Sequence, residues 1–89
     1  MDEKIQKILE EKIHESTSKK NEIALLVDSL GQVENLNAIG QGIIIGRVYN
    51  SFYYQSRRIL KRSPTDQEFS EFIQLLKEHK NELLGISFP

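Results

Sequence analysis

The chain contains no cysteine. This excludes disulfide cross-links, thiolate nucleophiles and zinc sites built from thiolates. Long apolar runs are also missing, because no stretch approaches the ~20 consecutive apolar residues that cross a bilayer. The first twelve residues, MDEKIQKILEEK, are charged and lack the apolar segment of a secretion signal. From these absences we expect a cytoplasmic protein with no membrane partner.

Acidic side chains are absent from the middle of the chain. Residues 35–65 contain five basic residues and no aspartate or glutamate, whereas residues 1–34 and 66–89 each carry a net charge of -3. The whole chain has 89 residues, a net charge of -1 and 38% hydrophobic residues. This length predicts one domain, residues 1–89, whose core is thin enough to benefit from a second chain.

Apolar residues recur at helical spacing near both ends of the chain. A first helix is predicted over residues 2–15, and a second runs from about Asn21 to Leu30 and ends at Gly31. Pro64 ends an earlier helix, and Thr65 begins the last one in a T-x-x-E capping box with Glu68. The predicted inward residues are Ile5, Ile8, Leu9 and Ile13, then Ile23, Leu26, Val27 and Leu30, and finally Phe69, Phe72, Ile73, Leu76 and Leu83.

The segment 38–62 fits a helix better than a strand. Helical spacing gathers Ala38, Ile45, Val48, Tyr49, Phe52, Ile59 and Leu60 on one face, and Arg47, Tyr54, Arg58 and Lys61 on the other. Strand alternation would mix apolar and charged residues, although the β-branched residues keep a strand over residues 43–49 as an alternative. We therefore predict an all-α fold, a small bundle of three to four helices with a long central third helix.

The first half of this third helix is apolar on every side, which predicts burial on all sides. Gly42 and Gly46 lie one helical turn apart, a spacing that lets two helix backbones approach closely. The predicted interface of a two-fold homodimer consists of Ile39, Gly42, Ile43, Ile44 and Gly46. Alternatively, the glycines fit a crowded helix crossing within one chain.

The basic residues of the middle segment form the one surface with functional promise. This predicted partner surface consists of Arg47, Tyr54, Arg57, Arg58, Lys61 and Arg62. Cations along a backbone groove with a stacking tyrosine suit nucleic acid. Five cations are few, however, and the isoelectric point of about 6.1 is low for a nucleic-acid-binding module. Another protein with an acidic surface is the alternative partner.

Motifs that carry catalysis are not formed. The glycines at 40, 42 and 46 lack the preceding strand of a dinucleotide-binding turn. Glu11 with His14, and His79 with Glu82, have metal-ligand spacing but fall on or near the solvated faces of their helices. We therefore expect no catalytic residue, cofactor or metal. The favoured hypothesis is a non-enzymatic, homo-oligomerising adaptor that binds proteins, and the alternative is a small nucleic-acid-binding regulator.

Overall fold

Regular structure in the described part of the chain is entirely helical. The computed structural model describes residues 1–31 and 33–88; Gln32 and Pro89, which the predicted domain includes, lie outside the described residues. The helices are α1 (Glu3–Thr17), α2 (Lys20–Asp28), α3 (Leu36–Gln55), α4 (Asp66–Glu78) and α5 (Lys80–Leu84), and a π-helical turn, Ser56–Leu60, continues α3. The predicted all-α class is confirmed, and the strand alternative for residues 43–49 is wrong. The predicted number of three to four helices is too low, because the described residues form five α-helices.

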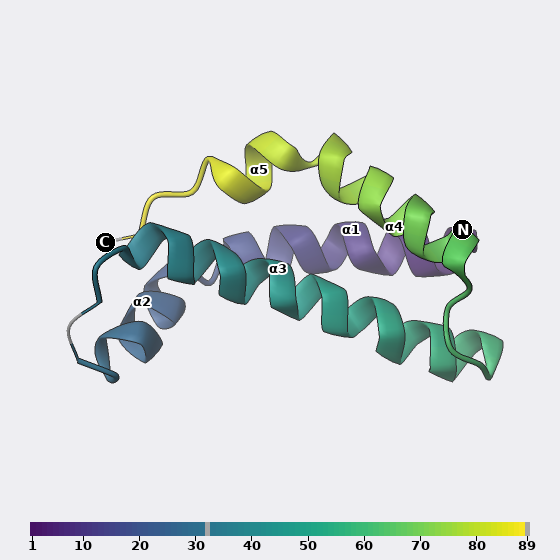
Figure 1. The fold of residues 1–89 in the computed structure, drawn as a ribbon, viewed down its shortest axis with the longest axis horizontal. Coiled ribbons are helices and arrows are strands. Elements are labelled where there is room, and N and C mark those ends of the chain that lie inside the picture. The colour runs from purple at the N-terminus through teal and green to yellow at the C-terminus, as the bar shows by residue number, and fades with distance from the viewer. Residues whose placement is uncertain (32, 89) are drawn as a thin grey trace.

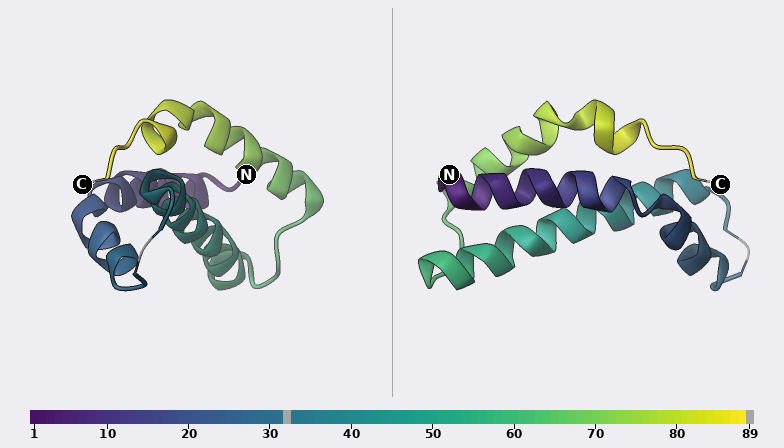
Figure 2. Two further views of the ribbon diagram at one scale, coloured as in Figure 1. Left: turned by 60° about the vertical axis from the view of Figure 1, so that its left-hand side comes forward. Right: turned by 180° about the vertical axis from the view of Figure 1, so that it is seen from behind.

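The long helix α3 occupies the centre of the fold, in contact with α1, α2 and α5. Figure 1 shows that α1 and α3 lie side by side and run in opposite directions, while α4 and α5 return across them. The two views in Figure 2 show α4 and α5 as an arch over α1 and α3. Helix α2 lies on the side away from the arch, at the end of the molecule where α3 begins. The predicted long central third helix is therefore confirmed.

Side-chain caps fix where several helices begin. The Asp2 carboxylate accepts a hydrogen bond from the Ile5 amide at the start of α1, and Asn35 does the same for the Ala38 amide at the start of α3. At the start of α4, Thr65 and Glu68 exchange both bonds of the predicted capping box, at 3.1 and 2.9 Å. These bonds satisfy amide groups that the first helical turn leaves free.

The core lies where α1, α3 and the α4–α5 arch meet. The rings of Phe52 and Phe72 stack at its centre, with centroids 4.5 Å apart. The buried hydrophobic cluster consists of Ile5, Leu9, Ile13, Ile23, Val27, Ile44, Val48, Phe52, Phe72, Leu75, Leu83 and Phe88. Within α1, the predicted residues Ile5, Leu9 and Ile13 are confirmed as inward-facing, whereas Ile8 is only partly buried.

Three of the predicted inward faces need correction. In α2, Leu26 and Leu30 are 57% and 77% exposed, because Ile23, Ala24 and Val27 turn toward the core instead. In α4, Phe69 and Ile73 are partly exposed, and Leu75, which was not predicted, is buried. In α3, the residues turned inward are Gly40, Ile44, Val48, Ser51 and Phe52, so Ala38 and Tyr49 lie outside the core.

The predicted last helix is interrupted at His79, which separates α4 from α5. Gly85 then ends α5 as predicted, with its amide bonded to the Asn81 carbonyl at 2.9 Å. The segment beyond it lies against the start of α3. There the Phe88 amide donates to the Asn37 side chain, and Gln41 donates to the Leu84 carbonyl. Over residues 1–31 and 33–88, no helix has both the length and the apolar character needed to cross a membrane.

Candidate functional site

The side of α3 that points away from the core is uncharged. Ile39, Gly42, Gly46 and Tyr49 recur there at steps of three and four residues, and we call this set the α3 stripe. All four are exposed, Ile39 by 38% and Tyr49 by 45%. Arg47 is the one charged residue among the twenty of α3, and it lies on a flank of the helix. An outward helix face is normally polar, so this stripe has the composition of a contact surface.

The two glycines of the stripe have no structural reason within the described chain. A Cβ atom added at Gly42 or Gly46 would meet no atom within 4 Å among the described residues. Neither residue has the positive φ that favours glycine, which Gly31 does have. Each glycine costs about 1 kcal/mol of helix stability relative to alanine. The alternative that they fit a crowded crossing within one chain is therefore wrong.

Gly40 provides the contrast. It lies on the inward side of α3, and an added Cβ would come within 2.5 Å of the Phe88 ring. This glycine is explained by packing within the chain, because the ring of Phe88 occupies the space that a side chain would need. Packing within the described chain therefore requires glycine at position 40, but not at positions 42 and 46.

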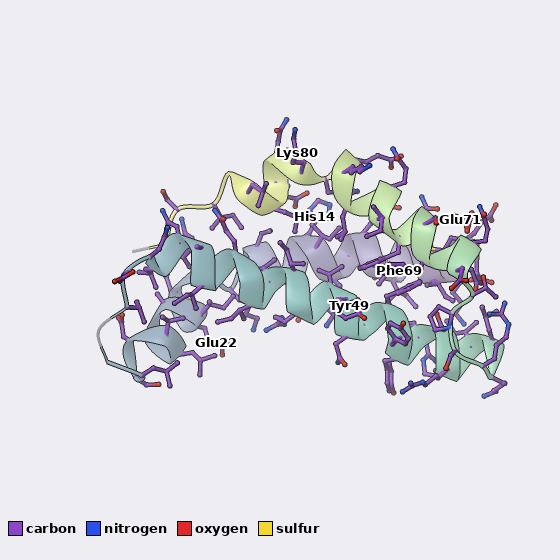
Figure 3. All side chains as sticks on the ribbon, viewed as in Figure 1. His14, Glu22, Tyr49, Phe69, Glu71 and Lys80 are labelled. Carbon is purple, nitrogen blue, oxygen red and sulfur yellow. The ribbon has the colours of Figure 1, made fainter. Side chains whose placement is uncertain are left out.

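An apolar groove adjoins the α3 stripe. The hollow has a volume of about 200 Å³ and lies between α3 and the arch of α4 and α5. Ile45 forms its α3 wall, one residue from Gly46, and Lys77 and Lys80 belong to its α4–α5 side. The remaining lining residues are Ile73, Leu76, Leu83 and Leu84. Tyr49 on α3 and Phe69 on α4 lie in the region between the two ribbons in Figure 3, and both rings are near that of Phe72.

The predicted dimer interface is divided by the structure. Ile39, Gly42 and Gly46 lie on the exposed stripe, and Ile43 is half-buried beside it. Ile44 has an exposed fraction of 0% and belongs to the core of its own chain. A helix cannot present all sides to a second chain while one side packs on its own core, so Ile44 is not part of the surface we consider below.

The predicted basic surface is divided as well. Arg47 donates to the Glu15 carboxylate at 3.1 Å and to the Ser16 hydroxyl at 3.2 Å, which ties α3 to α1. Lys12 also donates to Glu15, and its hydrogen bond is the main reason that the pKa of Glu15 is lowered, with Arg47 contributing less. Arg47 is therefore largely occupied in holding the two helices together.

Arg62 is occupied too. Its guanidinium donates to both oxygens of Glu68, at 2.6 and 3.2 Å. Hydrogen bonds from Arg62, and then from the Thr65 amide, lower the pKa of Glu68 to about 2. This arrangement fixes the turn between the π-helical turn and α4, because it joins a cation on one side to the capping box on the other.

The remaining members of the predicted surface stay exposed at one end of α3. Arg57 lies over the Tyr53 ring, 5.7 Å from its centroid, and Arg58 donates to the Gln55 side chain at 2.9 Å. Neither these two nor Lys61 forms an ion pair with any residue that the structure describes. Tyr54 lies on the flank, beside a shallow polar hollow of about 320 Å³ that Lys12 and Arg47 also line.

The two histidines, which sequence spacing placed on separate helices, meet in the fold. His14 of α1 lies 2.5 Å from the Glu82 carboxylate, and His79 lies 3.4 Å from the other oxygen of the same group. Their rings are arranged edge to face, 6.3 Å between centroids. Figure 3 shows His14 under the arch of α5. This contact depends on how α1 and α5 pack, so no local spacing signals it. Within the described ranges, no group of three or more His, Asp or Glu residues is placed to hold a metal ion.

No known protein family, curated protein or solved structure matches this chain. The geometry of the α3 stripe and of the surfaces beside it is therefore what bears on function.

Proposed function

We propose that this protein is a non-enzymatic protein-interaction module that associates with a second copy of itself through the α3 stripe. The observation that carries the proposal is the pair Gly42 and Gly46. Both are exposed, both lower the stability of α3, and an added side chain at either position meets nothing in the described chain. Close approach of a second helix backbone accounts for glycine at these positions.

The surroundings of the glycines support the same surface. Ile39 and Tyr49 extend the stripe by a turn on either side, and the apolar groove beside Ile45 widens it toward α4. A stable interface needs an apolar centre of this kind with few charges. Burial of the groove and stripe would also add apolar contacts to the small core that the described residues form.

The test is a side chain placed between the two helices. Gly46→Leu adds a side chain where the two helices approach most closely. Tyr54→Leu is the control, because it places a leucine on the exposed flank of α3, outside the stripe. We expect Gly46→Leu to weaken self-association by at least tenfold while the helical content is retained, and Tyr54→Leu to change it little. Equal self-association of the two variants, measured by sedimentation, would contradict the proposal.

A second candidate is a small nucleic-acid-binding regulator. It is favoured by one observation, the position of Arg57, Arg58 and Lys61 together at one end of α3 without an acidic partner in the described residues. Binding through these cations would weaken steeply as salt is added, since each phosphate contact releases counterions. Loss of a low-salt mobility shift in the Arg57→Ala, Arg58→Ala double variant would support this candidate. The absence of any shift for the unaltered protein would remove it.

A further inference from the structure

Charges of opposite sign lie at the two ends of α3. Arg57, Arg58 and Lys61 are at its carboxyl end, and Asp28 and Glu34 precede its amino end. All five are exposed, and none forms an ion pair with a described residue. Figure 1 shows these two ends at opposite extremes of a molecule whose long axis measures 40 Å. The acids and bases therefore cannot neutralise one another within one chain.

We propose that the two copies pair with their α3 helices antiparallel, so that the basic end of each copy faces the acidic end of the other. This inference rests on the self-association proposed above and specifies its orientation. An antiparallel pairing with Gly42 opposite Gly46 places the two-fold axis near Ile44. It also brings Ile39 opposite Tyr49, which puts the two larger residues of each stripe in contact across the axis.

The same register brings the charges together. Helix α3 begins at Leu36, eight residues or about 12 Å before Ile44, and Glu34 lies two residues before that start. Tyr54 lies ten residues after Ile44, about 15 Å along the helix. Glu34 of one copy therefore lies near Tyr54 of the other. Arg57 is one helical turn beyond Tyr54, and its side chain is long enough to reach back to a carboxylate at that level. Each dimer would contain two such pairs.

A parallel pairing fits the glycines equally well but not the charges. It places Gly42 opposite Gly42 and Gly46 opposite Gly46, and it also sets the three cations of one copy beside the three of the other. Opposed like charges select against an orientation, and opposite charges select for it. The charge distribution along α3 therefore distinguishes the two arrangements, which the shape of the stripe does not.

The orientation is tested by cross-linking two single-cysteine variants, Ile39→Cys and Tyr49→Cys, with a short bismaleimide. The chain has no cysteine of its own, so each variant reacts at one defined site. For an equimolar mixture of the two variants we expect cross-links that join position 39 to position 49, identified by mass spectrometry. Each variant alone should give little product. Products joining 39 to 39 and 49 to 49 would overturn the antiparallel arrangement and leave self-association intact.

A charge reversal gives a second readout. In the antiparallel arrangement, Arg57→Glu weakens self-association by roughly three- to tenfold, since two exposed ion pairs are lost per dimer. In a parallel arrangement it would remove repulsion and strengthen association. Lys7→Glu on the exposed side of α1 is the matched control, because it changes the net charge equally. Combining Glu34→Arg with Arg57→Glu should restore the affinity. A chain that stays monomeric and gives no cross-link in any mixture contradicts the proposed function itself.

Discussion

The rings of Phe52 and Phe72 are stacked: the angle between their planes is 3°, and their centroids are 4.5 Å apart. Phe52 belongs to α3 and Phe72 to α4, and both are fully buried. The Phe72 ring also lies within 6.4 Å of the rings of Tyr49 and Phe69. This stack joins the arch of α4 and α5 to the central helix.

Removal of this contact should be costly. We expect Phe72→Ala to lower the free energy of unfolding by about 3–5 kcal/mol, because it leaves a cavity beside Phe52. A loss of that size is a large part of the stability of a domain of this length. Phe69→Ala, at a partly exposed position of the same helix, should cost far less. Urea denaturation at a single protein concentration measures both, and equal losses would contradict the assignment of Phe72 to the centre of the core.

The glycines of α3 should respond to alanine with opposite signs. At concentrations where the chain is monomeric, Gly46→Ala should raise the free energy of unfolding by about 1 kcal/mol, since alanine favours the helix and meets no neighbour. Gly40→Ala should lower it by about 1–3 kcal/mol, because the new Cβ displaces the Phe88 ring.

A double variant shows whether Phe88 is the cause. In a Phe88→Ala background the steric conflict at position 40 is gone, so Gly40→Ala should become stabilising, as Gly46→Ala is. Thermal or urea denaturation of the four variants provides the comparison. If Gly40→Ala destabilises to the same extent with and without Phe88, this packing explanation is wrong.

Glu68 predicts an acid-dependent loss of stability. Its pKa is lowered to about 2 in the fold, from 4.5, chiefly by hydrogen bonding to Arg62. A lowered pKa means that the carboxylate stabilises the fold fully above about pH 4.5, and that this stabilisation is lost as the pH falls from 4.5 toward 2. The advantage of the unaltered protein over Glu68→Gln should therefore shrink across this range. An advantage that stays constant down to pH 2, or that shrinks equally in an Arg62→Ala background, would contradict the cause given.

Lys61 has a positive φ of 60°, in the left-handed region where the π-helical turn ends. A residue with a Cβ atom is strained in this conformation, and glycine is not. Lys61→Gly should therefore raise the free energy of unfolding by about 0.5–1 kcal/mol. Arg58→Gly, inside the turn, is the control and should lower it by about 1 kcal/mol. Melting temperatures that fall for both variants would show that Lys61 is held by an interaction of its side chain.

Local chemistry explains which parts of the fold were predictable. The capping box of Thr65 and Glu68 and the inward face of α1 depend on neighbouring residues. The capping box is confirmed, and so are three of the four residues predicted to face inward from α1. The inward face of α3 was only partly predicted, since its first half is apolar on opposite sides and periodicity cannot decide which side meets the core. The correct choice depends on α1, whose Glu15 holds Arg47.

Contacts between residues far apart in the sequence could not be predicted. The meeting of His14 and His79 at Glu82 depends on how α1 packs against α5. In α2, Ile23 and Val27 can share a buried face either with Ala24 or with Leu26. In the structure, Ala24 is buried beside them and Leu26 is exposed. The glycine spacing was visible in the sequence, but the open space beside it was not.

The mass of the protein in solution tests the central claim most directly. Sedimentation at micromolar concentration should give twice the chain mass of 10.3 kDa, with Gly46→Leu sedimenting as a single chain. A species of 10.3 kDa at every concentration tested would contradict the claim that a second copy covers the α3 stripe.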